Sequence, residues 1–269
     1  MRAAAIQMTS GSSVETNLRQ AAELLDRAAA LGAELAVLPE NFAFLGPGDA
    51  ARLAIAEAPG DGPLQAFLAL QARRLGLWIV GGTLPLTTGD AERAAAACLL
   101  YDAEGRQVAR YDKIHLFDVA IPGCEERYRE SASTRAGLLP VAVDSPAGRL
   151  GLAVCYDLRF PELFRRLAAD GAATVALPAA FTEVTGRAHW EVLVRARAIE
   201  NLSHVIAAAQ VGLHDNGRET HGDSMIVDAW GEVLARRRDG IGVIAADLNT
   251  ERQQALRKGF PALEHRILE

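Results

Sequence analysis

A carboxylate, an amine and a thiol each stand directly after a short apolar stretch of this chain. Glu40 follows residues 34–39, Lys113 follows residues 107–112, and Cys155 follows residues 149–154. Ligands of α/β proteins bind outside the carboxyl ends of strands, so residues that end strands can meet in one site. A thiol with an ordinary pKa of about 8.5 needs a base or a nearby positive charge to act as a nucleophile at neutral pH. Together, these residue types suit covalent catalysis by a cysteine.

Each of these residues, taken alone, favours an ordinary structural role. A cysteine that ends an apolar strand is usually a small buried hydrophobe. A glutamate after a proline usually caps a helix or faces water, and a lysine near aromatic residues usually extends its amine to solvent. The surrounding segments change the interpretation: residues 38–40 read LPE, residues 111–117 read YDKIHLF, and residues 155–162 read CYDLRFPE.

In this order, the three segments resemble the signature segments of the nitrilase superfamily of carbon–nitrogen hydrolases. The similarity continues through residues 186–191 (GRAHWE), 195–200 (RARAIE) and 222–228 (GDSMIVD), and so covers nearly the whole chain. Within the superfamily, the sequence of these segments most resembles the Nit branch, which includes amidases of deaminated glutathione and of ω-amides. The resemblance implies an α/β fold, a four-layer αββα sandwich, that pairs with a second subunit as a homodimer or higher homo-oligomer.

The resemblance also implies a catalytic group of Glu40, Lys113 and Cys155. Glu40 would take the thiol proton, and the thiolate would attack an amide carbonyl. Lys113 and the backbone N–H of Tyr156 would stabilise the oxyanion. Glu40 would then protonate the departing ammonia and activate the water that hydrolyses the thioester.

A further glutamate of the family falls at Glu130, where it would hold Lys113 or the substrate in place. Glu125 and Glu126 are nearby alternatives for that role. The chain departs from the family pattern at Ala136 and Arg187, where relatives commonly have proline. Both are expected in loops at the rim of the pocket, which leaves the chemistry intact and the substrate undetermined.

Arg159 is the candidate for substrate recognition. It follows Cys155 by four residues at the start of a predicted helix. In the Nit branch this arginine would meet a substrate carboxylate, which suits the two-pronged guanidinium group. The alternative is a structural ion pair with an acidic neighbour such as Glu162.

Apolar runs alternate with helical patterns along the whole chain, which predicts a single domain over residues 1–269. A turn over residues 101–106 predicts a hairpin. The predicted strands cover residues 3–8, 34–38, 78–82, 97–101, 107–111, 149–154, 174–177, 204–210, 224–228 and 242–247. The predicted helices cover residues 14–31, 62–75, 161–170, 187–201 and 250–258.

The 269 residues carry a net charge of −6, which argues against a nucleic acid or a membrane surface as partner. We expect no signal peptide and no membrane span. Cys98, Cys124 and Cys155 make an odd count without metal-type spacing, which favours a reducing cytoplasm.

No cofactor or metal is expected. The polar residues His189, His214, His221 and Asp223 match no metal-binding pattern, and no phosphate-binding loop follows Gly81. The leading hypothesis is hydrolysis of a small linear amide with an α-keto acid end, which needs only the amide and water. The alternatives are an N-carbamoyl amino-acid or aliphatic amidase and, from another class, a catalytically silent scaffold. Product release from a panel of these compounds would separate them.

Overall fold

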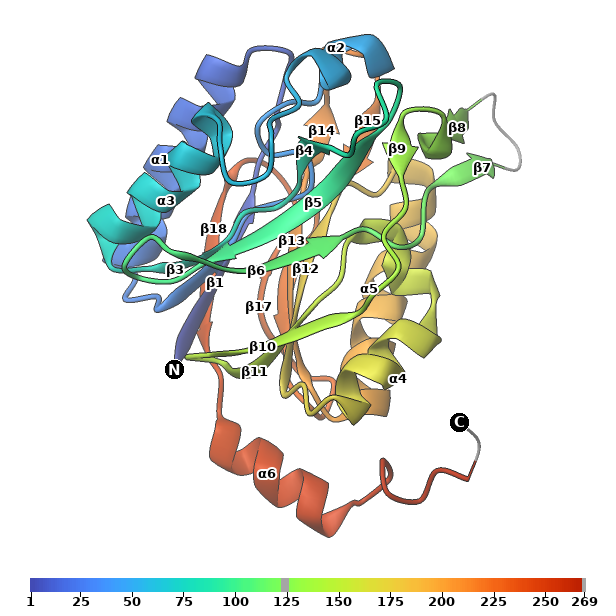
Figure 1. Ribbon diagram of the computed structural model, residues 1–269. Coiled ribbons are helices and arrows are strands. Elements are labelled where there is room, and N and C mark those ends of the chain that lie inside the picture. The colour runs from blue at the N-terminus through green and yellow to red at the C-terminus, as the bar shows by residue number, and fades with distance from the viewer. Residues whose placement is uncertain (122–125, 268–269) are drawn as a thin grey trace.

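Two facing β-sheets form the centre of the protein, with a helical layer outside each (Figure 1). The structure is a computed structural model that describes residues 1–121 and 126–267. The described chain therefore has the four-layer αββα arrangement that the sequence predicts.

The first sheet contains eight strands within the described residues. They are β1 (Arg2–Gln7), β2 (Leu35–Val37), β3 (Trp78–Val80), β4 (Leu84–Thr87), β5 (Ala94–Tyr101), β6 (Gln107–Asp112), β9 (Thr134–Arg135) and β18 (Gly242–Asp247). The main path runs β18-β1-β2-β3-β5-β4, and β6 and β9 also pair with β5. Strands β1, β2 and β3 are parallel, whereas β5 and β6 form the expected antiparallel hairpin.

The second sheet has the order β10-β11-β12-β13-β16-β17. Its strands are β10 (Val141–Ser145), β11 (Gly148–Leu152), β12 (Thr174–Ala179), β13 (His204–Ala209), β16 (Ser224–Val227) and β17 (Val233–Arg237). Strands β11, β12 and β13 are parallel. Two small hairpins lie outside both sheets: β7 (Asp118–Ala120) with β8 (Arg127–Arg129), and β14 (Val211–Leu213) with β15 (Glu219–His221).

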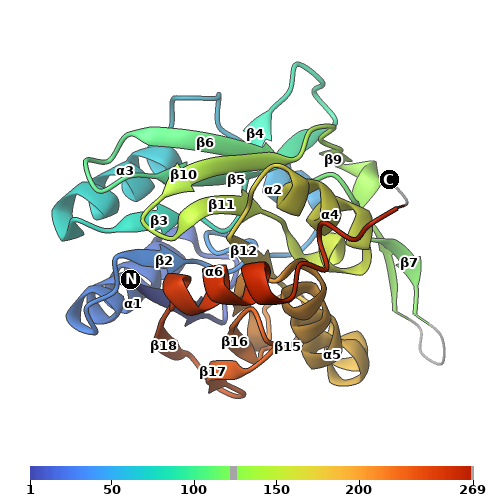
Figure 2. The same cartoon turned by 90° about the horizontal axis from the view of Figure 1, so that it is seen from below.

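Helices α1 (Val14–Ala30) and α3 (Pro63–Leu75) cover the first sheet, and α4 (Pro161–Ala169) and α5 (Glu183–Asn201) cover the second (Figure 1). A short α2 (Asp49–Ala54) and two 3₁₀ turns, η1 (Glu130–Ala132) and η2 (Cys155–Arg159), lie in the connections. Helix α6 (Thr250–Gly259) crosses the base of the molecule (Figure 2). None of the described helices is long and apolar enough to span a membrane.

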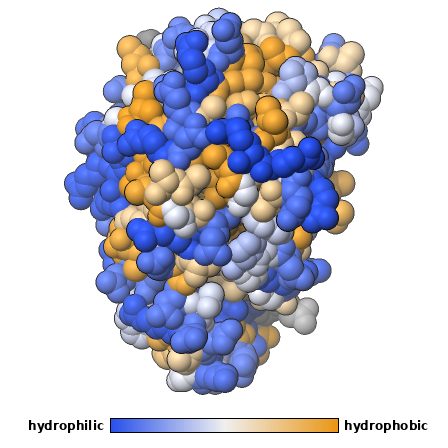
Figure 3. Space-filling model, turned by 90° about the vertical axis from the view of Figure 1, so that its left-hand side faces the viewer, coloured by the Kyte–Doolittle hydropathy of each residue, from blue (hydrophilic) through white to orange (hydrophobic). Residues whose placement is uncertain are grey.

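The buried apolar residues form two clusters. One fills the space between the sheets and beneath α4 and α5, where Val37, Ile206 and Trp190 contribute. The other lies between the first sheet and its helices, with Leu25 and Leu68 among its members. Figure 3 shows the side that carries α1 and α3, where hydrophilic side chains are interspersed with hydrophobic ones, as expected for helices with one face in solvent.

The main differences from the predicted elements have local causes. Helix α5 begins at Glu183 rather than at residue 187, because Thr182 caps it by accepting a hydrogen bond from the Thr185 N–H. Gly186 obscured this start, since glycine disfavours helices. Glycine is needed at this position because a Cβ would overlap the His221 side chain. Arg187 therefore lies within a helix, and its prediction as a loop residue is wrong. Strands β10 and β17 were missed because their half-exposed sequences include charged residues.

Candidate active site

The three residues singled out in the sequence come together at one end of the sandwich. Glu40 follows β2, Lys113 follows β6, and Cys155 opens the η2 turn that follows β11. Strands β2 and β6 belong to the first sheet, and β11 belongs to the second. The site is thus assembled from two facing sheets rather than along one sheet edge.

Lys113 lies between two carboxylates. Its Nζ is 2.8 Å from Glu40 Oε1, and 3.0 and 2.9 Å from the two oxygens of Glu130. The side chains of Lys113 and Glu40 are 2% and 5% exposed, and that of Glu130 is 21% exposed. The Cys155 thiol lies beside the Glu40 carboxylate and interacts with it, and its Sγ accepts a 3.5 Å hydrogen bond from the Ala180 N–H. One cation, two carboxylates and a thiol are therefore in contact.

Burial and charge together fix the protonation states of this cluster. Burial raises the pKa of Cys155, and the Glu40 carboxylate raises it further, so the resting thiol keeps its proton at neutral pH. Burial also opposes the charge on Glu40, but Lys113 outweighs it and holds the pKa of that carboxyl below its ordinary value. Burial alone would lower the pKa of Lys113, whereas Glu130 and Glu40 together raise it. A neutral thiol thus faces an ionised carboxylate that can accept its proton.

The backbone around the cluster adopts an uncommon conformation. Cys155 has a φ of 47°, and Asn41, next to Glu40, has a φ of 56°. Residues other than glycine pay about 1–2 kcal/mol in this left-handed region, and such residues are enriched at functional sites. The carbonyl of Glu40 is held by Gln210 Nε2 at 3.0 Å, and Gln210 is fully buried. The packing of Gln210 therefore fixes the position of the Glu40 backbone.

Of the two candidate glutamates within the described residues, Glu130 and Glu126, only Glu130 contacts Lys113. Glu130 binds Lys113 and also accepts a 2.7 Å hydrogen bond from the Phe117 N–H. Glu126 instead accepts a 2.6 Å hydrogen bond from the Tyr128 hydroxyl. Glu125 and Cys124 lie outside the described residues.

A cavity of about 680 Å³ opens onto the cluster. Its walls include the four residues of the cluster together with aromatic and arginine side chains. The aromatic residues are Phe44, Phe117, Tyr128, Tyr156 and Phe181, and the arginines are Arg52, Arg127, Arg129, Arg159 and Arg218. The cavity is therefore suited to a substrate that carries negative charge, in spite of the net charge of the chain.

Arg159 lies in the wall of this cavity. Its guanidinium group stands 5.1 Å from the ring centre of Phe181 and 5.9 Å from that of Tyr156, and its Nη1 is 3.1 Å from His189 Nδ1. Among the described residues, its hydrogen-bond partner is His189 and no carboxylate pairs with it, so the predicted alternative, a pair with Glu162, is not present. The guanidinium group is held by aromatic contacts and faces the cavity.

Sequence reasoning missed Arg218, which also lines the cavity. Its Nη2 donates a hydrogen bond to the Ala180 carbonyl, its guanidinium carbon lies 5.1 Å from the ring centre of Tyr128, and its charge helps to lower the pKa of Glu40. Its Nε is buried and has no hydrogen-bond partner within the described structure. No local pattern marks this residue, because the β14–β15 hairpin brings it to the site from a distant part of the sequence.

The histidines considered as metal ligands have other partners. His214 bonds the Ser10 carbonyl and the Thr220 hydroxyl, and His221 pairs with Glu183. No group of three or more His, Cys, Asp or Glu side chains in the described part of the chain could hold a metal ion. Ala136 is exposed, and neither it nor Arg187 lines the cavity, so the expectation that both lie at the pocket rim is wrong.

Comparison with known proteins gives a consistent result. The family model described as carbon-nitrogen hydrolase matches residues 2–258. A deaminated glutathione amidase of Synechocystis sp. is 45% identical over 268 residues, with coverage of 98% of this chain and 97% of the relative.

Solved structures agree. The NitFhit protein of C. elegans superposes with a TM-score of 0.92 at 38% identity, covering 99% of this chain; this chain spans 65% of that longer protein. An amidase from Nesterenkonia sp. AN1, whose structure shows Michael addition of acrylamide at the active site cysteine, superposes with a TM-score of 0.80 at 29% identity, covering 97% of this chain and 98% of the amidase. The predicted nitrilase-type fold is confirmed. The chain belongs to the carbon-nitrogen hydrolase family and is an amidohydrolase that acts on non-peptide carbon–nitrogen bonds.

Proposed function

We propose that Cys155 is the nucleophile of this amidohydrolase, with Glu40 as general base and Lys113 as the cation that stabilises the oxyanion. The observation that carries this proposal is the buried contact of Cys155 with Glu40, which is itself 2.8 Å from Lys113. A thiol whose pKa is raised needs a base at the moment of attack, and Glu40 is the ionised carboxylate in contact with it.

The reaction proceeds through an acyl-enzyme. Glu40 accepts the thiol proton as Sγ of Cys155 bonds to the amide carbon, and the carbonyl oxygen becomes an oxyanion bound by Lys113 Nζ and the Tyr156 N–H. The carbon–nitrogen bond breaks when Glu40 returns the proton to the leaving nitrogen. Glu40 then deprotonates a water molecule that attacks the thioester, which releases the acid and restores the thiol. Glu130 keeps Lys113 charged and in place throughout.

The substrate that we propose is deaminated glutathione, with shorter ω-amides such as α-ketoglutaramate next. The name of the Synechocystis relative supports the first. The cavity supports it as well, because about 680 Å³ lies within the range that holds drug-sized ligands and leaves room for a leaving group larger than ammonia. Arg159, which has no carboxylate partner among the described residues, would bind a carboxylate of the substrate.

Release of ammonia or of a primary amine from four compounds tests this proposal. The panel contains deaminated glutathione, α-ketoglutaramate, an N-carbamoyl amino acid and a neutral aliphatic amide. We expect the highest kcat/KM on deaminated glutathione and no turnover by Cys155→Ala on any compound. Higher kcat/KM on the carbamoyl or aliphatic compound would replace the substrate assignment while leaving the catalytic group in place.

We also propose that the chain forms a homodimer in the cytoplasm. The side chains of Val184, Val192 and Ile199 on α5 are apolar and exposed, which supports a subunit contact. A helix face that stays in solvent would be expected to carry polar side chains at such positions. Cys98 and Cys155 are unpaired, which suits a reducing compartment. Light scattering across a dilution series measures the mass, and a monomer at every concentration would contradict the dimer.

A further inference from the structure

We propose that Asp157 is a positioning residue that fixes Cys155 and Lys113 relative to each other across the two sheets. The inference rests on the proposed function, because it concerns the geometry of that catalytic group. Asp157 does not line the cavity and is fully buried. It therefore acts through other residues and not on the substrate.

The carboxylate of Asp157 accepts four hydrogen bonds. Oδ2 accepts from the Tyr111 hydroxyl at 2.7 Å and from the Val154 N–H at 2.8 Å. Oδ1 accepts from the His115 N–H at 3.1 Å and lies 2.7 Å from His115 Nδ1, which carries the proton in this pair because a carboxylate only accepts. Each oxygen thus receives two donors.

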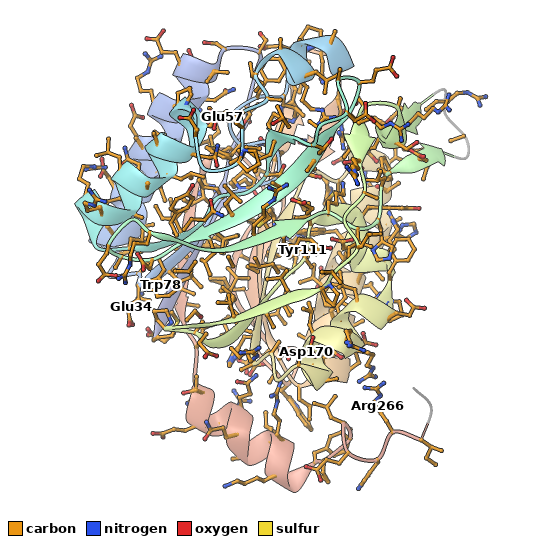
Figure 4. The ribbon with its side chains drawn as sticks, viewed as in Figure 1. Glu34, Glu57, Trp78, Tyr111, Asp170 and Arg266 are labelled. Carbon is orange, nitrogen blue, oxygen red and sulfur yellow. The ribbon has the colours of Figure 1, made fainter. Side chains whose placement is uncertain are left out.

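These donors come from both sides of the active site. Val154 immediately precedes Cys155 on the second sheet's side, whereas Tyr111 and His115 flank Lys113 by two residues in each direction on the first sheet's side. A single carboxylate therefore connects the turn that carries the thiol to the segment that carries the amine. Tyr111, labelled in Figure 4, projects from β6 into the interior between the sheets and is fully buried.

The network is also supported by packing and by the backbone around Cys155. The His115 ring stacks on Phe160 with ring centres 3.7 Å apart and planes 6° apart. The bond from Val154 N–H to Asp157 spans Cys155, whose φ of 47° needs support from its surroundings. Among the described residues, Asp157 has no Lys or Arg partner, and the side chains that bond to it are Tyr111 and His115. Burying a carboxylate without a cation costs free energy, so such a group is a poor way to stabilise a fold. Its presence here fits a need to bind four donors that converge on one point.

The decisive variant is Asp157→Asn, which keeps the shape of the side chain. Because each oxygen receives two donors, the amide NH₂ must face two donors whichever way the side chain flips. Displacement of catalytic groups by about 1 Å can cost about 10²-fold in rate. We expect kcat on deaminated glutathione, or on the best amide of the panel, to fall by about 10²-fold with KM changed less than about threefold. We also expect iodoacetamide to alkylate Cys155 more slowly.

Asp102→Asn is the matched control. Asp102 is also buried and accepts two backbone N–H bonds and one from Arg106, but it lies in the β5–β6 turn at the opposite end of β6 from Lys113. It should lower the melting temperature without changing kcat. If Asp157→Asn does not fold, Tyr111→Phe removes one donor to the same carboxylate and should still lower kcat selectively.

The proposal would be overturned if Asp157→Asn lost stability as Asp102→Asn does but kept normal kcat. If Asp157→Asn does not fold, the same result for Tyr111→Phe would overturn it. Failure of the proposed function has a different signature, since wild type and Cys155→Ala would then turn over the same amide equally.

Discussion

Replacing Lys113 by methionine tests how the buried ion cluster serves catalysis. The substitution keeps an unbranched side chain as far as the ε position and removes the charged Nζ between Glu40 and Glu130. The Lys113 side chain is 2% exposed and the Glu40 side chain is 5% exposed, so solvent cannot compensate for the lost charge. Breaking a buried ion pair on one side costs about 3–5 kcal/mol. At about 2–4 °C per kcal/mol for a chain of this size, the melting temperature should fall by roughly 6–20 °C.

The same change should affect the rate in two ways. Loss of one oxyanion donor lowers kcat by about 10²–10³-fold. Burial also opposes the charge on Glu40 without compensation from Lys113, so the pKa of Glu40 should rise and the acidic limb of the kcat/KM profile should move to higher pH. In the variant a Glu40 pKa raised above its unfolded value favours the folded state more as pH falls. The stability deficit relative to wild type should therefore shrink from about pH 8 to about pH 5.5.

These quantities are measured by amine release across a pH series and by thermal unfolding at each pH. Arg106→Met is the control, because Arg106 also joins two carboxylates, Asp102 at 2.7 Å and Glu104 at 3.0 Å, but on an exposed turn. It should leave kcat and its pH profile unchanged. A Lys113→Met enzyme with normal kcat and an unmoved acidic limb would refute the role assigned to this lysine.

Three further outcomes are expected. Cys155→Ala should abolish turnover with the fold intact, whereas Cys98→Ala should keep normal kcat. Mass spectrometry of the protein treated with a slow substrate should locate the acyl group on Cys155, and an adduct on Cys98 would contradict this. Arg159→Met should lower kcat/KM about 10-fold to 150-fold on carboxylate-bearing amides, from about 1.5–3 kcal/mol per charge-assisted bond; an equal loss on a neutral amide of similar length would assign Arg159 a purely structural role. Gly82→Ala should lower the melting temperature, because Gly82 has a φ of 54° and a Cβ would overlap the Pro39 carbonyl; an unchanged unfolding temperature would contradict that strain.

The residues of the proposed catalytic group were recognisable because they end strands and stand in distinctive segments. The apolar runs before Glu40 and Cys155 are buried and show directly in the sequence. The partnership of Lys113 with Glu130 came from the family resemblance alone, since a glutamate 17 residues away in sequence carries no local signal.

The rest depended on contacts between distant segments. Which strands are neighbours is a non-local property, so the origin of Glu40 and Cys155 on different sheets could not be read from either segment. Arg218 reaches the cavity through the β14–β15 hairpin, whose strands of three residues each are too short to show a periodic pattern. Asp157 stood inside a recognised segment, but three of its four hydrogen bonds come from Tyr111 and His115, which the packing of one sheet on the other brings to it.

The division of the active site between the sheets has a consequence during biosynthesis. The segment that ends at Lys113 emerges from the ribosome before Cys155, and the thiol becomes reactive only when the second sheet docks on the first. Until then Cys155 lacks its proposed base and cation, Glu40 and Lys113, so an incompletely folded chain carries an ordinary thiol. Acylation by an amide substrate is thereby limited to the folded site, and the appearance of amidase activity during refolding should coincide with docking of the two sheets.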